Sequence, residues 1–547
     1  MMTLLPSPLL LSFLVFAFAG PVAANALVDG HQDRVKSRPG YDAPLPSSWY
    51  SGFLDYELEG QQIHTHYILV EAERESVSTA PTPLIYWSNG GPGASSMFGL
   101  LTELGPLILS DDSIKTDAYR DTGLPTLFYN TRSWTRLGHI LVFDAPAPVG
   151  YSYCNSDEQP DHDHNSTNHK KECISWTDEL ASQNAYLALK TFFQDKFPVL
   201  QQTPLYLTGE SYAGIYIPTL ARRIVENQDD FAINLKGFAV GDGCLGTETG
   251  ICGSLSSDSR FDYWLVLFLA GHGQIPLSTF AHILQVCKST TTATTDHHHH
   301  ESSRRLGIFA SNIAIDKDAC QEALDTLEAQ VGGYYEYALY DECGARNGLM
   351  SSSFLSGAEN DYPCGGGVVM EDYVALPQVK EALHVDNGTF FSVDNANNFD
   401  YTPTEKDISG FYKSQVGKLK MLVYNGDTDP AITSFAAQNW TSNLGLDVKE
   451  DWRPWTLDGC KRVGGYVTRY KGGLDFLTIR GAGHLVPTYK PDAAFAFMKH
   501  WIDGNEYPRF DKSCIPHRGE KLTADAQKNN VVEHVAFTSD RETGTMD

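Results

Sequence analysis

The sequence predicts an α/β fold in which helices cover both faces of a mostly parallel sheet. Short continuous apolar runs that end in loops, at 83–87, 139–144 and 204–208, are typical of buried parallel strands. An amphipathic helical pattern over 178–196 separates the second run from the third, which is the alternation expected of an α/β sheet. A region of different character interrupts this pattern, and we expect it to be a cap subdomain inserted between core strands.

We expect the chain to consist of five segments. These are a cleaved signal peptide at 1–26, the first part of the core at 27–240, the cap at 241–370, the second part of the core at 371–510 and a polar, disordered tail at 511–547. The first segment has an apolar stretch followed by small residues, which is the pattern of a secretory signal, although its start lacks Lys and Arg. A polar stretch of low complexity at 289–305 predicts a solvated loop within the cap.

The core elements follow in order. Loose alternation over 50–70, with a turn at Glu59 and Gly60, predicts a β-hairpin. The strand at 83–87 runs into a glycine-rich loop at 88–96. After the cap, strands are predicted at 419–424 and 476–479. A last helix is predicted from Pro491 to Trp501, because proline suits the first turn of a helix.

Composition excludes several classes of partner. The chain has 547 residues, of which 42% are hydrophobic, which is typical of a large globular protein. Its formal net charge of −27 disfavours nucleic acid and anionic membrane as partners. No later run approaches the roughly 18 apolar residues that a membrane span needs. We therefore expect neither nucleic acid nor a membrane as a partner.

Ten cysteines in a chain with a signal peptide indicate disulfides rather than a zinc site, because none has the C-x₂-C spacing. The four histidines at 297–300 could bind a metal, but nothing fixes partners around them, so we favour a solvated loop and predict no metal. Sequons at Asn165, Asn387 and Asn439 predict glycosylation sites.

The stretch 204–226 reads as strand, sharp turn and helix, with Ser211 in the turn. This is the arrangement of a nucleophile elbow, which exposes the serine hydroxyl at the carboxyl end of a strand. The pattern G-x-S-x-G is incomplete, since Ala213 replaces its last glycine and Gly214 follows one place later. An ordinary turn with a serine near a helix N-cap remains the alternative for these residues alone.

Two further groups follow predicted strands, Asp429 and His484. The chain order Ser211, then acid, then His is that of the α/β-hydrolases, and loops after parallel strands meet at one edge of the sheet. We therefore predict a triad of nucleophile, base and orienting acid, which needs no cofactor. The alternatives are a capping histidine, a turn aspartate before Pro430, and Asp427 in place of Asp429.

Acyl transfer also needs donors for the developing oxyanion. Gly90 and Gly91 allow the backbone after the 83–87 strand to approach closely, and their amides can point into the site. The second donor is expected to be the amide of Tyr212, the residue after the nucleophile.

Five sequence blocks resemble the signatures of the serine carboxypeptidase family and span roughly residues 45–505. They are WSNGGPGASS at 87–96, ELGP at 103–106, GESYAG at 209–214, NGDTD at 425–429 and GAGHLVP at 481–487. The resemblance implies the α/β-hydrolase fold and a triad of Ser211, Asp429 and His484. It further implies an oxyanion hole from Gly91 and Tyr212. The substrate's terminal carboxylate would be bound by the side chains of Trp87, Asn89, Glu103 and Glu210.

The resemblance places Glu103 beside Glu210. Two close carboxyl groups cannot easily both ionise, so the pair would hold a proton at acidic pH and donate it in a hydrogen bond to the substrate carboxylate. Without the resemblance, Glu103 would be a surface acid of a helix and Glu210 a spacer in the elbow.

The chain departs from the family pattern in two places. Ala94 replaces a cysteine of the glycine-rich loop, so Cys343 and Cys364 are left to pair otherwise, with each other as one option. Asp242 replaces the asparagine of a GNG motif, a nearly isosteric change that we expect to be tolerated and to leave the triad untouched. Local pairs Cys154 with Cys173, Cys244 with Cys252 and Cys287 with Cys320 are expected, although connectivity does not follow from sequence.

The sequence therefore predicts a serine carboxypeptidase that acts best at acidic pH, in the secretory pathway, and is secreted, vacuolar or lysosomal. Its substrates would be the C-termini of peptides and proteins, cleaved through an acyl-enzyme. An acyltransferase of the same family and a non-catalytic binding or protective protein on the same fold are the alternatives. The oligomeric state is left open, a homodimer included.

Overall fold

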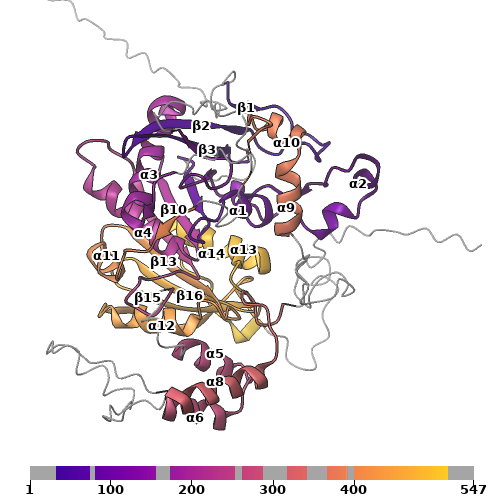
Figure 1. Ribbon diagram of the computed structural model, residues 1–547. Coiled ribbons are helices and arrows are strands. Elements are labelled where there is room, and N and C mark those ends of the chain that lie inside the picture. Colours follow the sequence, from indigo (N-terminus) through magenta and orange to yellow (C-terminus); the bar gives the residue numbers. More distant parts are fainter. Residues whose placement is uncertain are drawn as a thin grey trace, which may run out of the picture.

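The structure is a computed structural model that describes residues 32–73, 81–155, 173–252, 262–287, 317–341, 366–389, 391 and 399–514 (Figure 1). The predicted signal peptide, the 289–305 loop, the residues beyond 514, Asn165, Cys343 and Cys364 lie outside the described residues.

A twelve-stranded sheet crosses the described part of the chain. Its order is β1 (Arg34–Val35), β2 (Trp49–Leu58), β3 (Gln61–Val70), β7 (His139–Phe143), β4 (Leu84–Ser88), β10 (Leu205–Glu210), β11 (Leu235–Gly241), β13 (Lys420–Gly426), β16 (Leu474–Ile479), β15 (Val463–Tyr470) and β14 (Val448–Thr456), with β8 (Tyr153–Asn155) beside β3. Two small pairs lie apart, β5 (Leu107–Ile108) with β6 (Phe128–Tyr129) and β9 (Trp176–Thr177) with β12 (Tyr401–Thr402).

The six central strands, β7 to β16 in this order, are parallel. Antiparallel strands flank them on both sides. The predicted 50–70 hairpin is present, and Glu59 and Gly60 turn it with φ of 50° and 75°. The hairpin of β14 and β15 was not predicted, and it adds two antiparallel strands beside the parallel central sheet that was expected.

Thirteen α-helices are described: α1 (Met97–Thr102), α2 (Asp117–Thr122), α3 (Asp178–Thr191), α4 (Ala213–Glu226), α5 (Tyr263–Gly271), α6 (Leu277–Val286), α8 (Lys317–Val331), α9 (Gly366–Ala375), α10 (Pro377–Ala382), α11 (Ser409–Ser414), α12 (Ser434–Asn443), α13 (Val486–Tyr489) and α14 (Pro491–Asp503). The predicted 178–196 helix starts at α3, where the Thr177 hydroxyl caps the amide of Leu180, and its last turn, Phe192–Lys196, is a π-helix. The final helix begins at Pro491 as predicted and ends at Asp503, where Gly504, with a φ of 72°, forms the C-cap.

Alternate residues of the central strands point to opposite faces of the sheet, and a separate hydrophobic core covers each face. In β10, Leu205 and Leu207 join the core that contains α3, α4 and α12, while Tyr206 joins the core that contains α1, α9 and α14. In β13, Met421 and Leu422 divide in the same way. Because helices cover both faces, a substrate can reach the sheet only at the carboxyl ends of its parallel strands.

Helices α5, α6 and α8 form a smaller hydrophobic cluster of their own at one end of the molecule (Figure 1). They belong to the segment that the sequence predicted to be a cap. The disulfide between Cys287 and Cys320 ties the end of α6 to the start of α8. The expected pairs of Cys154 with Cys173 and of Cys244 with Cys252 are also confirmed, and Cys460 pairs with Cys514.

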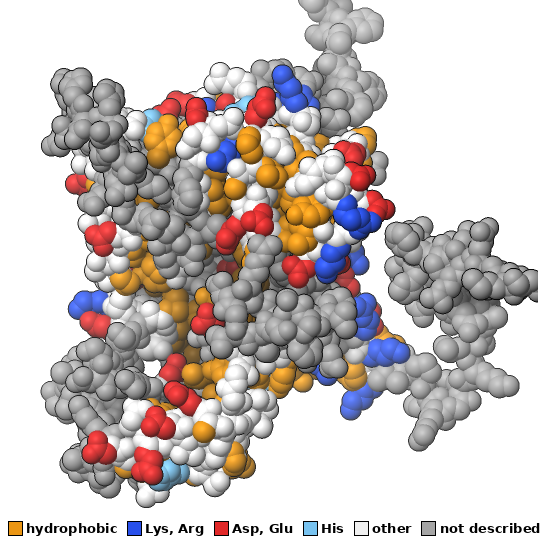
Figure 2. Space-filling view, turned by 45° about the vertical axis from the view of Figure 1, so that its right-hand side comes forward, with side chains coloured by type: hydrophobic (Ala, Val, Ile, Leu, Met, Phe, Trp, Pro, Cys, Tyr) orange, Lys and Arg blue, Asp and Glu red, His pale blue; other side chains and the backbone are white. Residues whose placement is uncertain are grey.

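On the face seen in Figure 2, Asp and Glu side chains are spread over the core and the helical unit at the bottom. Lys and Arg side chains gather mainly along the right-hand edge of this face. Within the described residues, no helix has the length and apolar character of a membrane span. Asn387 lies in an exposed turn, and Asn439 lies partly exposed on α12.

Candidate active site

Ser211 lies between β10 and α4, in the sharp turn predicted from the sequence. Its φ of 63° is in the left-handed region, which is rare for a residue with a side chain and typical of a nucleophile elbow. The backbone holds this conformation because the Ser211 amide donates to Gly241 O at 2.9 Å and Ser211 O accepts from the Cys244 amide at 3.0 Å. The end of β11 and the loop after it therefore support the turn.

The tight packing around the elbow explains its imperfect glycine pattern. A Cβ on Gly209 would lie 2.5 Å from Ser88 O, and a Cβ on Gly214 would lie 2.2 Å from Cys244 O. Ala213 is buried, yet its methyl group fits. The close approach of the next loop falls on Gly214, so glycine is needed one place later than in the general pattern.

Asp429 follows β13 and His484 follows β16, and the two side chains meet. His484 Nδ1 is 2.8 Å from Asp429 Oδ2, and both residues are at most 3% exposed. The Asp429 carboxylate also accepts from the amides of Ala431 at 2.8 Å and Ile432 at 3.2 Å, which fixes its orientation. His484 Nε2 is buried and has no hydrogen-bond partner within the described residues. This nitrogen is therefore available as a base.

Asp427, the rival acid, has a different neighbour. Its Oδ1 accepts from the Gly481 amide at 2.6 Å, so it stabilises the start of the loop that carries His484. The structure thus places Asp429, and not Asp427, against His484.

A segment of the predicted cap lies over both triad loops. The Leu339 amide donates to Thr428 O at 2.9 Å, and the His484 amide donates to Tyr337 O at 2.7 Å. The Tyr337 ring lies 4.9 Å from the imidazole, centroid to centroid. This segment therefore helps to hold His484, a contact that could not be predicted from the sequence.

The glycine-rich loop backs directly onto the elbow. A Cβ on Gly90 would lie 2.3 Å from the Tyr212 amide nitrogen and 2.8 Å from Ser211 Cβ, so only glycine fits. Gly91 has a φ of 105°. The amides of Gly91 and Tyr212 donate no hydrogen bond within the described residues, which leaves both as candidate donors to an oxyanion.

Beside the elbow, Asn89 joins two buried glutamates. Its Nδ2 donates to Glu103 Oε1 at 3.2 Å and to Glu210 Oε1 at 2.9 Å. Its Oδ1 accepts from Trp87 Nε1 at 2.9 Å and the Gly99 amide at 3.0 Å, and these bonds fix the amide orientation. All four residues implied for carboxylate binding are therefore gathered in one cluster.

The two glutamates hold protons to unusually high pH. Burial raises the pKa of Glu103 to about 7. Burial and the neighbouring Glu103 charge raise the pKa of Glu210 well above its usual value. Their Oε2 atoms are buried and lack a hydrogen-bond donor within the described residues, as expected when two carboxyl groups must share a proton. The pair can therefore act as a hydrogen-bond donor.

Asp242 corrects one expectation, since its side chain touches the triad. It is fully buried, and its carboxyl oxygens accept from the Gly426 amide at 3.0 and 3.3 Å. Burial, then the charges of Asp429 and Glu210, raise the pKa of Asp242 well above its usual value, and its carboxyl group contacts that of Asp429. The exchange of asparagine for aspartate thus adds a titrating group behind the orienting acid.

Asp242→Asn should be more stable than the wild type at pH 8, by roughly 2–5 °C in Tm, and little different at pH 4. As the pH rises past the ordinary pKa of aspartate, the unfolded chain releases its proton while the folded chain keeps it. Wild-type stability therefore falls until the raised pKa of Asp242 is passed. Asparagine does not titrate and can still accept from Gly426. Thermal unfolding between pH 4 and 8 measures the difference, and parallel curves for the two proteins would contradict it.

A second Ser-His-Asp series is sealed in the core. Ser51 Oγ is 2.9 Å from His66 Nε2, and His66 Nδ1 is 2.8 Å from Asp144 Oδ2. All three residues are at most 1% exposed, so no substrate can reach them. Ser95 Oγ, from the glycine-rich loop, donates to Asp144 Oδ1. This series therefore anchors the loop that carries Gly91, and the sequence offered no signal for it.

Comparison with known proteins gives a consistent result. The family model described as serine carboxypeptidase matches residues 39–504. The lysosomal protective protein of Mus musculus is 30% identical over 87% of this chain and 94% of its own length. Serine carboxypeptidase 1 of Hordeum vulgare is 27% identical over 86% of this chain and 93% of its own. In fold, the chain is similar to a prohormone-processing carboxypeptidase from Saccharomyces cerevisiae, with a TM-score of 0.58, 19% identity, and coverage of 85% and 94%.

Proposed function

The chain belongs to the serine carboxypeptidase family and is a serine-type carboxypeptidase, and on this premise we propose which of its residues do the work. Ser211 is the nucleophile, His484 the general base and Asp429 the acid that orients it. The amides of Gly91 and Tyr212 form the oxyanion hole. The substrates are the C-termini of peptides and proteins.

The reaction proceeds in two acyl transfers. Ser211 Oγ attacks the carbonyl carbon of the last peptide bond while His484 Nε2 takes its proton, and the oxyanion is stabilised by the two amides. His484 then donates that proton to the leaving amino group, and the C–N bond breaks. A water molecule, deprotonated by the same nitrogen, then attacks the acyl carbon, and His484 returns the proton to Ser211 Oγ as the ester bond breaks. Asp429 stabilises the imidazolium in both steps, as supported by its 2.8 Å contact with Nδ1.

One observation supports cleavage at the C-terminus in particular, the bridge from Asn89 to both Glu103 and Glu210 next to the elbow. Glu210 directly precedes Ser211 in the chain, so a carboxylate bound by this cluster is held next to the nucleophile. A buried group that donates hydrogen bonds to a carboxylate selects substrates that end there, because other peptides leave it unpaired.

The KM for an N-blocked dipeptide with a free C-terminus should rise about tenfold or more between pH 5 and pH 8. The raised pKa of Glu103, about 7, and that of Glu210 keep the pair protonated at pH 5, where it donates to the substrate. Loss of the proton replaces a hydrogen bond with charge repulsion, and a charge-assisted hydrogen bond contributes about 1.5–3 kcal/mol. Steady-state kinetics at pH 5, 6, 7 and 8 measure KM directly.

The matched control is the same dipeptide with an amidated C-terminus, whose KM should not depend on pH in this way. Glu210→Gln removes one of the two titrating groups and should reduce the rise. A constant KM between pH 5 and 8 for the free carboxylate would contradict the proposed binding site.

We further propose that the protein functions in the secretory pathway and acts as a secreted, vacuolar or lysosomal enzyme. Four disulfides in the described residues support an oxidising route of folding. Proton binding by Glu103 and Glu210 supports an acidic site of action.

A further inference from the structure

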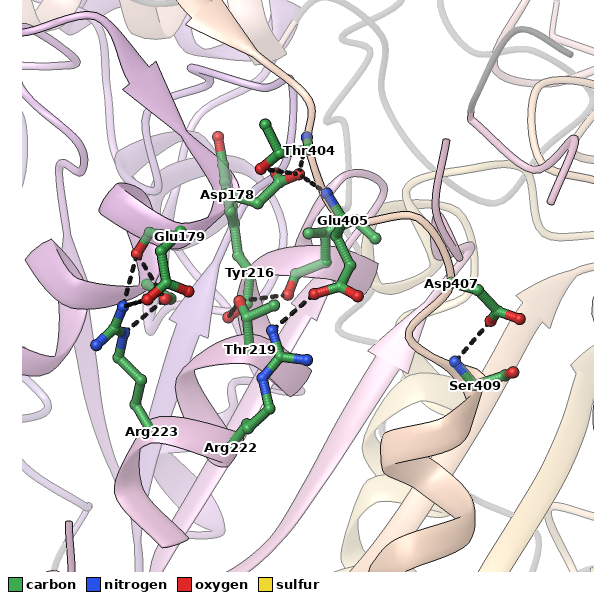
Figure 3. A network of polar contacts seen from close by, with 12 residues as sticks. Asp178, Glu179, Tyr216, Thr219, Arg222, Arg223, Thr404, Glu405, Asp407 and Ser409 are labelled. Atoms are coloured by element: carbon green, nitrogen blue, oxygen red, sulfur yellow. Dashed lines mark hydrogen bonds and ion pairs between the residues drawn. The ribbon is translucent and has the colours of Figure 1, made fainter. Parts of the chain in front are cut away.

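Asp178, the first residue of α3, lies at the centre of a buried polar network (Figure 3). The residue is 3% exposed. Oδ1 accepts from the hydroxyl groups of Tyr212 at 2.7 Å and Tyr401 at 2.6 Å. Oδ2 accepts from the amides of Thr404 at 2.5 Å and Glu405 at 2.6 Å. All four of these partners donate a hydrogen bond to Asp178, as a carboxylate requires, because a carboxylate can only accept hydrogen bonds.

Three of these donors come from a segment more than 200 residues away. Residues 401–405 reach Asp178 because Tyr401 and Thr402 of β12 pair with Trp176 and Thr177 of β9, immediately before α3. The N-terminus of α3 also favours a negative charge at this position. Asp178 therefore joins α3 to the 401–405 segment and to the elbow.

The contact with Tyr212 links the network to the proposed oxyanion hole. Tyr212 is 5% exposed, and its ring packs edge-on against Tyr216 at 5.2 Å and Tyr401 at 5.7 Å between centroids. Burial, then the charge of Asp178, raise the pKa of Tyr212 far above its usual value, so its hydroxyl stays a donor at any working pH. The side chain is thus held at both its ring and its hydroxyl group.

A second contact holds the same segment without touching Tyr212. Arg222, on α4, donates to Glu405 Oε2 at 2.6 Å (Figure 3). This ion pair fastens the 401–405 segment to the helix, farther from the elbow. Removal of this ion pair is therefore a control, because it should loosen the 401–405 segment but leave the hydrogen bond between Asp178 and Tyr212 in place.

We propose that Asp178 is a positioning residue for the oxyanion hole, which it fixes by holding the side chain of Tyr212. The Tyr212 amide lies at the first turn of α4, next to Gly90, where a small rotation of the residue changes the direction of its N–H. A hydroxyl group anchored on a buried carboxylate resists that rotation. The transition state benefits and ground-state binding does not, because the oxyanion forms only during the reaction. This inference rests on the proposed role of the Tyr212 amide.

The test compares Tyr212→Phe, Asp178→Ala and Asp178→Asn with the wild type and with Arg222→Gln. Tyr212→Phe keeps the ring and the amide and should lower kcat for an N-blocked dipeptide about 10- to 100-fold, with KM within about twofold. Asp178→Ala should lower kcat at least as much. Asp178→Asn should recover most of the loss, since its amide can donate to both phenol oxygens. Arg222→Gln should keep kcat within about threefold.

An N-blocked amino-acid aldehyde gives a second measurement. The Ser211 hydroxyl adds across the aldehyde carbonyl, and the oxygen of the resulting hemiacetal takes the place of the oxyanion. Its inhibition constant should rise in Tyr212→Phe by about the same factor as kcat falls. Asp178→Ala with Tyr212→Phe should be no worse than Asp178→Ala alone, because both act through one contact.

The inference would be overturned if Tyr212→Phe had the same kcat and the same aldehyde affinity as the wild type. This holds even if Asp178→Ala fails to fold. Effects that multiply in the double variant would overturn it too. A change in Tm alone, with kcat intact, would show that Asp178 is only structural. If the wild type is active and Tyr212→Phe has the same kcat, only the positioning role is refuted. Equal activity of wild type and Ser211→Ala would instead refute the proposed function.

Discussion

Ser211→Ala is expected to lower kcat for an N-blocked dipeptide by at least about 10⁴-fold and to leave KM and the fold nearly unchanged. Alanine removes the hydroxyl group that forms the acyl-enzyme, so both transfers stop. The backbone of the turn stays, because the hydrogen bonds to Gly241 and Cys244 are made by main-chain atoms. Release of the free C-terminal amino acid at pH 5 is the measurement.

The control is thermal unfolding, which should give Ser211→Ala a Tm within a few degrees of the wild type. A parallel reaction with an added alcohol separates hydrolysis from acyl transfer, since an acyltransferase would form ester in preference to free acid. Amino-acid release by the variant at the wild-type rate would exclude Ser211 as the nucleophile.

Asp429→Asn should lower kcat by about 10⁴-fold. Asparagine presents an N–H where His484 Nδ1 now meets Oδ2 at 2.8 Å. The imidazole then places its proton on Nε2, and that nitrogen can no longer accept the proton of Ser211. Asn can still accept from the Ala431 amide, so the loop should keep its conformation.

Asp427→Asn is the matched control, two residues away in the same loop. Its carbonyl oxygen can replace the bond to the Gly481 amide, so kcat should stay within about tenfold of the wild type. Both variants are measured with the same dipeptide at several pH values. A larger loss in Asp427→Asn than in Asp429→Asn would reverse the assignment of the acid.

Much of the fold could be predicted because it depends on local patterns. The 50–70 hairpin, the strands around the glycine-rich loop and the elbow, and the helix from Pro491 follow from apolar periodicity and turn residues. The hairpin of β14 and β15 was missed. In β14, the edge strand, only Trp455 and Thr456 are buried, so the apolar signal of this strand is weak.

The candidate site divides in the same way. Ser211, Asp429 and His484 could be proposed from their order, since loops after parallel strands meet at one edge of the sheet. The choice of Asp429 over Asp427 could only be stated as a preference, because two aspartates two residues apart in a loop carry the same sequence signal.

The sequence alone determined the fold class, the family resemblance and the choice of the proposed reacting groups, which lie in short contiguous motifs. Only the tertiary structure decided which groups touch them. The contacts of Asp242 with Asp429, of Asp178 with Tyr212 and of Tyr337 with His484 join distant parts of the chain. Such contacts depend on how covered strands and loops pack together, and the residues that make them look like ordinary surface or turn residues when read in order.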